Sequence, residues 1–433
     1  MEIKTGYKQT EIGVIPENWK IKPLKELCVP NGLVRGPFGG SLKKEYFVDS
    51  GIKVYEQKNA IEKNAVIGSY FVDNSKFSEL KRFEVFEKDF IVSCSGTIGR
   101  IFQIPHGAPK GIINQALLKI KTNEEVVNEK YFLLYFEWEK FQERIIDNTQ
   151  GGAMKNLVGM SIFKNTSIAL PSTLSEQNAI AEALSGADNL ITSLEKLIAK
   201  KKDIKQGAMQ LLLTGKKRLP GFSGEWEIKT IGDLFSISGG LSASRDKLSD
   251  DGYCYLHYGD IHGSNKSYID VGEEYPKIPK LQVNIKSVTP KSLLNDGDVV
   301  FVDASEDDEG ASKHIVIKNQ NNIPYISGLH TIVLKSKDNS LVNLYKQYCF
   351  KTNAVKKQFK FFAVGTKVTG ISKTNISNVQ LLLPPTKGEQ SLIAQALSDM
   401  DNEIEELESK LSKYRLIKQG MMQELLTGKK RLV

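Results

Sequence analysis

The sequence predicts an α+β protein in which two mixed α/β domains are separated by two long antiparallel coiled-coil helices, with an internal pseudo-twofold repeat. The first observation is a duplicated octamer, LLTGKKRL, at Leu212–Leu219 and Leu425–Leu432. The second is a constant shift of 213 residues that aligns Glu176–Leu219 with Glu389–Leu432 without a gap, with 27 identities in 44 positions. The third is that the long segments that precede the two copies have almost no sequence similarity to each other. Variable and constant parts therefore alternate along the chain.

The repeat continues upstream of the aligned block. IALPSTLSEQ (Ile168–Gln177) parallels LLLPPTKGEQ (Leu381–Gln390). A weaker copy opens each half, where PENWKIKPLKELC resembles SGEWEIKTIGDLF and Trp19 matches Trp226. We therefore expect variable domains at residues 1–171 and 219–384, and constant helices at residues 172–218 and 385–433.

The constant segments carry apolar residues at heptad spacing, which is typical of a coiled coil. The predicted seam residues are Ile180, Leu184, Ala187, Ile191, Leu194 and Ile198 in the first copy, and Ile393, Leu397, Met400, Ile404, Leu407 and Leu411 in the second. Lys201 and Tyr414 interrupt the seam. The alternative is a pair of unrelated core helices, but equal phase and equal length favour pairing with each other.

Charge favours an antiparallel pairing of the two helices. That direction places Glu403, Glu405, Glu406 and Glu408 opposite Lys196 and Lys200, whereas a parallel pairing places the middle two glutamates beside Thr192 and Ser193. Opposite charges across a seam set orientation more than stability. Each helix ends in a basic cluster, 216–218 and 429–431, which is either a solvated helix end favoured by the helix dipole or a phosphate or partner contact.

The two variable segments are rich in short runs typical of β-strands, separated by Gly, Asn and Asp. Each segment ends in an aromatic-rich sequence that is predicted to be helical. The predicted strand runs are YFVDNSKF, DFIVSCSGTIGRIFQI and LLKIK in the first half, and GYCYLHYGDI, GDVVFVDAS, KHIVIK and HTIVLKSK in the second. The predicted helices are EKYFLLYFEWEKFQERI and NLYKQYCFKTNAVKKQF. This pattern predicts curved sheets backed by helices.

Polar residues on Gly-rich loops of these segments are candidates for contacts to DNA bases and phosphates, because Arg, Lys, Asn and Ser side chains provide the hydrogen bonds that both require. For any one of them an ordinary turn is the alternative. The candidates are Arg35, Lys43, Lys44, Ser95, Thr97, Arg100, Lys155, Asn156, Ser244, Arg245, Lys247, Asn265, Lys266, Lys313, Lys367 and Lys373.

Composition and missing motifs exclude several classes of protein. The sequence has no GxxxxGK[ST] phosphate loop, no Asn-Pro-Pro-aromatic tetrapeptide of amino-methyltransferases and no HExxH, so no catalytic residues, cofactor or metal are expected. The acidic run DASEDDEGASK would suit a metal-dependent nuclease, but it has no counterpart in the first half. Four scattered cysteines, no apolar run of membrane length and no apolar N-terminal segment predict a soluble, cytoplasmic protein that does not bind membranes. The net charge of +8 permits nucleic-acid binding without requiring it.

These motifs together resemble the specificity subunit of Type I restriction–modification systems. The resemblance rests on the sequence motifs YKQTEIGVIPENW, LPSTLSEQ, LPPTKGEQ, IKQG and FSGEW. It covers the entire chain. It implies a non-catalytic subunit whose two variable domains are target-recognition domains, each reading one half of a split double-stranded DNA target. It also implies that the helices space the two domains and dock two methyltransferase subunits, which recruit the restriction subunits.

Two other classes stay open on the residues alone. One is a non-catalytic coiled-coil adaptor whose variable domains bind protein or glycan. The other is a stand-alone nuclease or methyltransferase. A gel shift with the purified chain separates the adaptor from the DNA reader, and activity with S-adenosylmethionine in the absence of other subunits tests the enzyme.

Overall fold

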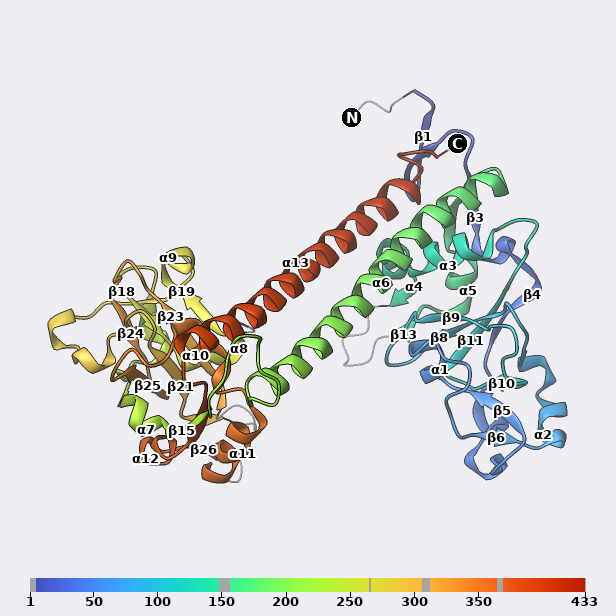
Figure 1. Cartoon of the computed structure of the whole chain (residues 1–433). Coiled ribbons are helices and arrows are strands. Elements are labelled where there is room, and N and C mark those ends of the chain that lie inside the picture. The colour runs from blue at the N-terminus through green and yellow to red at the C-terminus, as the bar shows by residue number, and fades with distance from the viewer. Residues whose placement is uncertain (1–4, 148–155, 265, 306–311, 364–368, 433) are drawn as a thin grey trace. The chain divides into compact units, whose positions relative to one another are not determined.

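The structure is a computed structural model that describes residues 5–147, 156–264, 266–305, 312–363 and 369–432. Its contacts divide the chain into two compact units, coloured along the chain in Figure 1. Unit 1 consists of residues 1–194 and 410–433, and unit 2 consists of residues 195–409. Each unit therefore combines one variable domain with part of both long helices.

Unit 1 contains two four-stranded sheets. One has the strand order β4-β11-β8-β9, from β4 (Cys28–Arg35), β8 (Phe90–Ser93), β9 (Ile101–Gln103) and β11 (Leu117–Thr122). The other has the order β6-β5-β10-β7, from β5 (Ile52–Tyr55), β6 (Phe71–Val72), β7 (Glu84–Val85) and β10 (Gly111–Ile113). The remaining elements of the unit are β1 (Tyr7–Thr10), β2 (Gly13–Pro16), β3 (Lys20–Pro23), η1 (Leu24–Leu27), η2 (Gly39–Ser41), η3 (Lys44–Tyr46), α1 (Gln57–Ile61), α2 (Asn74–Glu79), η4 (Lys81–Phe83), α3 (Glu129–Glu137), α4 (Glu139–Ile145), β12 (Ile146–Asp147), β13 (Asn156–Leu157), α5 (Met160–Asn165) and β14 (Ser167–Leu170).

Unit 2 also contains two sheets, one of five strands and one of four. Its five-stranded sheet has the order β16-β25-β21-β23-β19, from β16 (Phe235–Gly239), β19 (Tyr268–Asp270), β21 (Val299–Val302), β23 (His314–Lys318) and β25 (Thr331–Ser336). The second sheet has the order β17-β20-β18-β24, from β17 (Leu248–Ser249), β18 (Tyr253–Leu256), β20 (Lys280–Leu281) and β24 (Tyr325–Ser327). The remaining elements are β15 (Glu227–Thr230), α7 (Ile231–Leu234), η5 (Arg245–Lys247), α8 (Tyr258–Gly263), α9 (Val271–Glu274), η6 (Ile285–Ser287), η7 (Pro290–Ser292), β22 (Ala304–Ser305), α10 (Asn343–Cys349), α11 (Asn353–Phe362), β26 (Thr369–Gly370), α12 (Lys373–Ser377) and β27 (Gln380–Leu383).

The two variable domains have the same core topology despite their different sequences. The order β4-β11-β8-β9 corresponds to β16-β25-β21-β23, and the parallel pair β5–β10 corresponds to the parallel pair β18–β24. A glycine marks the same point in both. A Cβ on Gly36 would lie 1.8 Å from the carbonyl oxygen of Asn114, and a Cβ on Gly240 would lie 1.9 Å from that of Gly328. Any larger residue is excluded there because the two backbones touch.

Several predicted elements differ in the structure. The aromatic-rich helix of the first half is divided into α3 and α4, because Trp138 has extended backbone angles, and that of the second half is divided into α10 and α11. The predicted strand GYCYLHYGDI ends at Leu256, where His257 and Asp260 form a capping box that starts α8. YFVDNSKF gives only the two residues of β6 before Asp73 caps α2.

The two constant segments form α6 (Leu174–Leu212) and α13 (Lys387–Leu425), each of 39 residues. In unit 1, Asp188 of α6 pairs with Lys418 of α13 at 2.5 Å. In unit 2, Lys205 of α6 pairs with Asp401 of α13. Along α6 the numbers rise while those of the partners on α13 fall, so the segments are antiparallel, as predicted (Figure 1).

The predicted lysine partners were wrong. The ion pairs in unit 2 join Glu403 to Lys201 at 2.6 Å and Glu408 to Lys202 at 2.7 Å, rather than involving Lys196 or Lys200. Lys201 lies three residues after Ile198, on the seam itself, and Lys202 lies directly beside it. Side chains at these positions face the partner helix, whereas Lys196 and Lys200 are turned away from it.

Burial follows the predicted seam closely. Ile180, Leu184, Ile191, Leu194, Ile198, Ile393, Leu397, Ile404 and Leu411 are buried, whereas Leu407 is half-buried. Ile180 and Leu184 join the core of unit 1, together with Leu425 and Leu426. Ile393 and Leu397 join the core of unit 2, together with Leu212 and Leu213. The ends of both helices are thus part of the cores of the domains.

Candidate nucleic-acid interface

The loop between β8 and β9 carries three candidate residues of unit 1, and hydrogen bonds hold its shape. The Ser95 amide donates to Oε1 of Gln57 at 2.9 Å, and the Ser93 hydroxyl donates to the Thr97 carbonyl at 2.6 Å. The Arg100 amide donates to the Ser93 hydroxyl at 3.0 Å, while the Arg100 side chain is exposed. The loop therefore presents Thr97 and Arg100 from a fixed backbone.

Arg35, at the end of β4, lies half-buried at the end of the sheet where the loop between β8 and β9 also lies. Its guanidinium lies beside the Cys94 thiol, and this contact opposes the effect of burial, which raises the pKa of Cys94 to about 12. The thiol is therefore neutral at physiological pH and leaves the charge of Arg35 uncompensated.

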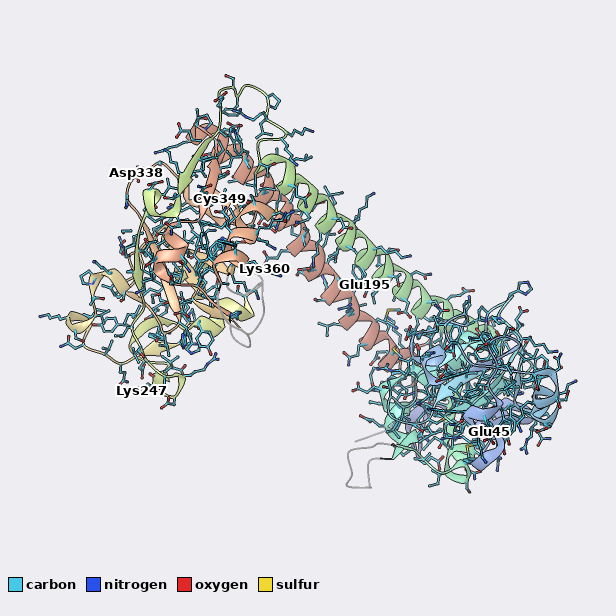
Figure 2. The ribbon with its side chains drawn as sticks, turned by 90° about the horizontal axis from the view of Figure 1, so that it is seen from below. Glu45, Glu195, Lys247, Asp338, Cys349 and Lys360 are labelled. Atoms are coloured by element: carbon cyan, nitrogen blue, oxygen red, sulfur yellow. The ribbon has the colours of Figure 1, made fainter. Side chains whose placement is uncertain are left out.

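Lys43 and Lys44 are exposed at the start of η3. Lys43 lies 3.7 Å from Glu45, which is labelled in Figure 2. An exposed ion pair of this length contributes little to stability. Both ammonium groups are therefore accessible to solvent and to a ligand.

In unit 2, Ser244, Arg245 and Lys247 lie exposed at and around η5, and Figure 2 labels Lys247 on this loop. Nη2 of Arg245 lies 3.4 Å from Oδ1 of Asp260 on α8. The loop is thus tied to α8 through an ion pair, whereas Lys247 is exposed.

The residues around Tyr258 form a polar aromatic cluster that the sequence did not reveal. The rings of His257, His262 and His330 lie 4.4, 6.2 and 5.4 Å from the Tyr258 ring. Nδ1 of His330 also lies 3.1 Å from Oδ1 of Asp303. Burial lowers the pKa of His257, and Arg245 lowers it further while Asp260 opposes both. His257, Tyr258 and His262 are neighbours in the sequence, but Asp303 and His330 come from distant stretches of chain, so spacing along the sequence did not predict the cluster.

The remaining described candidates of unit 2 are exposed lysines, two in connecting segments and one at the start of a helix. Nζ of Lys313 donates to the His262 carbonyl at 2.9 Å, and Nζ of Lys266 lies 5.7 Å from the Tyr268 ring. Lys373 begins α12 and lies against the end of β16. Lys155, Asn265 and Lys367 lie outside the described residues, as does the side chain of Asn156.

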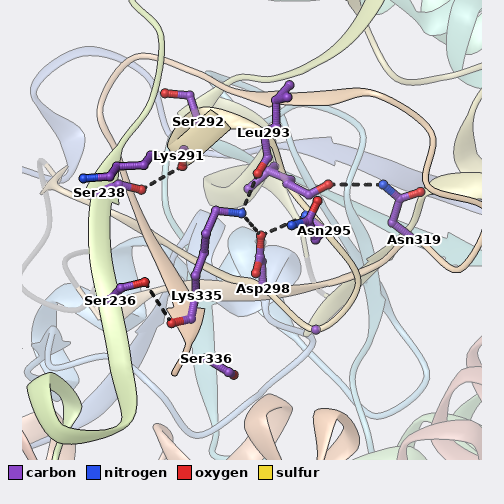
Figure 3. Close-up of polar contacts among 12 residues, drawn as sticks. Ser236, Ser238, Lys291, Ser292, Leu293, Asn295, Asp298, Asn319, Lys335 and Ser336 are labelled. Atoms are coloured by element: carbon purple, nitrogen blue, oxygen red, sulfur yellow. Dashed lines mark hydrogen bonds and ion pairs between the residues drawn. The ribbon is translucent and has the colours of Figure 1, made fainter. Parts of the chain in front are cut away.

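Near the end of β16 in unit 2, a partly buried ion pair fixes the loop that supports this strand (Figure 3). Nζ of Lys335 lies 2.5 Å from Oδ2 of Asp298 and donates to the Leu293 carbonyl at 2.6 Å. The Ser292 hydroxyl donates to the Gly239 carbonyl at 3.0 Å, and the Ser238 hydroxyl donates to the Lys291 carbonyl at 2.8 Å. The end of β16 is therefore held rigidly.

The repeated octamer forms part of each domain rather than a free helix end. Arg431 binds buried Glu176 through Nε and Nη2, at 2.6 and 2.8 Å, and Trp19 donates to the same carboxylate at 3.3 Å. In the equivalent contact of unit 2, Arg218 binds buried Glu389, with Nη2 at 2.7 Å from Oε2. The neighbouring lysines 216, 217, 429 and 430 are exposed. Among the described residues, only the arginine of each basic cluster pairs with a buried glutamate.

A second set of repeated residues is largely exposed on the two long helices. Lys200, Ile204, Gly207 and Gln210 lie on one face of α6, and the identical residues Lys413, Ile417, Gly420 and Gln423 lie on the same face of α13. We call these two sets the repeated stripes. Ile204 and Ile417 are 47% and 43% exposed. A Cβ on Gly207 or Gly420 would meet no atom within 4 Å, so neither glycine is required by packing.

The described residues contain no group of three or more His, Cys, Asp or Glu side chains arranged to hold a metal ion. Over the same ranges, no helix has the length and apolar character needed to cross a lipid bilayer.

Known proteins share both the sequence pattern and the fold. A family model described as the Type I restriction modification DNA specificity domain matches residues 16–206 and again residues 223–413. The Type I restriction enzyme MjaVIII specificity subunit of Methanocaldococcus jannaschii is 25% identical over 388 residues, which cover 83% of each chain.

Two solved chains have a similar fold at low sequence identity. The Type I restriction–modification S subunit from M. genitalium gives a TM-score of 0.54 at 14% identity, covering 98% of both chains. A chain described under "Structural basis underlying complex assembly and conformational transition of the type I R-M system" gives a TM-score of 0.60 at 15% identity, covering 96% of this chain and 99% of that one.

Proposed function

The chain belongs to the family of Type I restriction–modification DNA specificity subunits, and from this premise we propose how its parts divide the work. Each variable domain reads one half of a bipartite double-stranded DNA target. The constant helices space the two domains and dock two methyltransferase subunits, which in turn recruit the restriction subunits. The chain itself is non-catalytic and acts in the cytoplasm.

One observation carries the DNA-reading part of this proposal. The two domains keep the same order of four strands in the sheets that contain β4 and β16, and the same glycine contact, whereas the loops at the ends of the strands differ in length and in residues. A common scaffold with different loops suits two readers of different sequences, because side chains on loops contact base edges while the scaffold fixes their position. The adaptor alternative has no comparable support.

The repeated stripes support the docking of two identical partners. A glycine inside a helix costs about 1 kcal/mol relative to alanine. The chain accepts this cost at the same place in both helices, although a side chain there would meet nothing in its own fold. A glycine beside an exposed isoleucine allows the backbone of another helix to approach closely. We therefore assign each stripe to one methyltransferase subunit.

The proposed function is tested with the complex of this chain and its methyltransferase. We expect methylation mapping of random-sequence DNA to give one bipartite target, and a gel shift at stated salt to show preference for that target over scrambled duplex. Methylation without sequence preference, or no binding of DNA at any salt concentration, would contradict the proposal.

A further inference from the structure

In each unit we call the sheet that contains β4 or β16 the central sheet. One row of residues across this sheet lies at the same position in both domains. Backbone pairing links Arg35, Leu118, Val92 and Ile101 in unit 1. The same pairing links Gly239, Ile332, Phe301 and His314 in unit 2. Gly36 and Gly240, the residues directly after β4 and β16, make the equivalent backbone contacts described above. Arg35 and Gly239 are therefore structural equivalents.

In unit 2 the space above Gly239 is filled by a cation from another element. A Cβ on Gly239 would lie 2.7 Å from Nζ of Lys373 and 3.2 Å from its Cε. The Lys373 ammonium thus occupies the place where a side chain of residue 239 would begin. This is the face of the sheet to which Arg35 projects in unit 1, because residues paired directly across strands share a face.

The corresponding residues of α5 and α12 differ in the opposite sense. The shift of 213 residues makes Met160 of α5 the counterpart of Lys373 of α12. Met160 is half-buried and packs against the core of unit 1. The first domain therefore has a cation on the strand and methionine on the helix, whereas the second has glycine on the strand and a cation on the helix. Each domain retains one cation at this point.

We propose that Arg35 and Lys373 fill one equivalent cation site, which binds a DNA backbone phosphate in each half of the target. This inference rests on the proposed function and identifies a contact within it. Arg and Lys share positive charge but not the planar fork that reads a base edge. A contact common to two domains that read different sequences also fits the sequence-independent part of the DNA.

The surroundings of the site leave both cations free for an anion. Within the described ranges, neither Arg35 nor Lys373 forms an ion pair with a carboxylate, and the neighbour of Arg35 is the neutral Cys94 thiol. Another cation recurs at an equivalent position in the two domains, just before the strand that lies three places from β4 or β16 in the sheet. The Ser93 amide donates to the Arg100 carbonyl at 2.9 Å, and the equivalent Val302 amide donates to the Lys313 carbonyl at 3.3 Å. Arg100 and Lys313 thus enter the sheet at equivalent positions.

The test moves the cation between elements in the full chain bound to its methyltransferase. The probe is a random-sequence duplex long enough to cover both domains, titrated over a range of salt. We expect Lys373→Met to weaken binding and to lower the slope of log K against log salt by about one unit, without changing the methylated sequence. Lys286→Met, which removes an exposed lysine elsewhere in the same unit, should leave the slope unchanged.

The decisive variant is Gly239→Arg combined with Lys373→Met, which gives the second domain the arrangement of the first. We expect it to restore the slope and the affinity. The reciprocal Arg35→Gly/Met160→Lys protein should likewise bind as the wild type does. Thermal unfolding of each variant distinguishes loss of the contact from loss of the fold.

Three outcomes overturn the inference. Wild-type slope in folded Lys373→Met would show that Lys373 does not contact phosphate. Failure of the folded Gly239→Arg/Lys373→Met protein to recover would show that the two positions are not equivalent. Altered target sequence with unchanged slope would make Lys373 a base reader. In each case wild-type binding still supports the proposed function, whereas absence of wild-type binding removes both.

Discussion

At the scale of single residues, His314 shows how burial decides protonation. It pairs with Phe301 in the central sheet of unit 2, with ring centroids 5.0 Å apart, and Phe350 lies 5.0 Å away on another side. Complete burial lowers its pKa to about 3, and nearby Lys351 lowers it in the same direction. The equivalent position in unit 1 is Ile101, so the scaffold requires an apolar side chain and not a charge.

We predict that acid destabilises the wild type through His314. Its folded pKa lies below the unfolded value of about 6.5, so the unfolded chain takes up the proton as pH falls below about 6.5. Between pH 7.5 and pH 5.5 this costs about 1.4 kcal/mol of unfolding free energy. His314→Phe should keep the aromatic packing and lose that part of the pH dependence. Urea unfolding of both proteins at the two pH values measures it, and identical pH dependence would contradict the assignment.

Arg431 illustrates a second residue whose role is internal. We predict that Arg431→Met lowers the stability of unit 1 by about 3 kcal/mol, because it leaves the carboxylate of Glu176 buried without its cation. Lys430→Met, one residue earlier and exposed, should change stability by less than about 0.5 kcal/mol. Adding Glu176→Gln to the arginine variant should recover part of the loss. Denaturant unfolding gives all three values, and equal effects of the two single changes would show that the pair is not stabilising.

At the scale of elements, the repeated stripes give a test of docking. We predict that Gly207→Leu blocks one methyltransferase site and that Gly207→Leu/Gly420→Leu blocks both, because the added side chains fill the space needed by the partner. Native mass spectrometry at saturating methyltransferase should then find one and no bound subunits, against two for the wild type. Retention of two subunits by the double variant would refute the assignment.

Gly186→Leu provides the matched control for that experiment. Gly186 lies exposed on α6, and its Cβ would also meet nothing within 4 Å. Its counterpart on α13 is Asp399, so this glycine is not repeated. The control should bind two subunits. The stabilising effect of replacing a helical glycine is similar in all of these variants, so differences between them report docking.

The helices were also the part of the fold that the sequence predicted best. Their heptad seam and their antiparallel direction follow from a repeat of apolar residues and from complementary charge. The segments expected to be helical, 172–218 and 385–433, extend past the observed helix ends at Leu212 and Leu425. The roles of the identical polar residues could not be predicted, because Glu176 and Arg431 lie 255 positions apart in the sequence. Identity between repeats marked these residues without distinguishing an internal contact from an external one.

The equivalence of Arg35 and Gly239 was hidden for a different reason. Strand β4 contains an irregularity between the pairs Ile120–Leu33 and Thr122–Cys28, where extra residues lie within the strand. β16 pairs without such a shift. An alignment of letters from the start of each strand therefore places Arg35 opposite the wrong residue, and only the backbone pairing restores the match. The exposed candidates on loops were found because Gly, Ser and Lys mark turns in any sequence.

At the scale of the whole molecule, the two domains are predicted to specify their half-sites independently. Exchanging residues 30–165 for the equivalent segment of another family member should change one half of the methylated sequence and preserve the other. The reason is that the loop residues change while the core residues at the ends of α6 and α13 remain. Methylation mapping of the hybrid complex checks this, and a change in both halves would show that the domains read cooperatively.

The contribution of α13 to the first core also sets an order of events during synthesis. Leu425 and Leu426 complete a core whose other fully buried members all precede residue 185, so unit 1 lacks part of its interior until the ribosome has passed the entire second domain. Unit 2 is continuous in sequence, from residue 195 to residue 409, and has all its parts earlier. Domains of a nascent chain usually fold from the N-terminus onward. Here the domain that is synthesised first finishes folding last. Its core remains incomplete and exposed while more than half of the chain is still being translated.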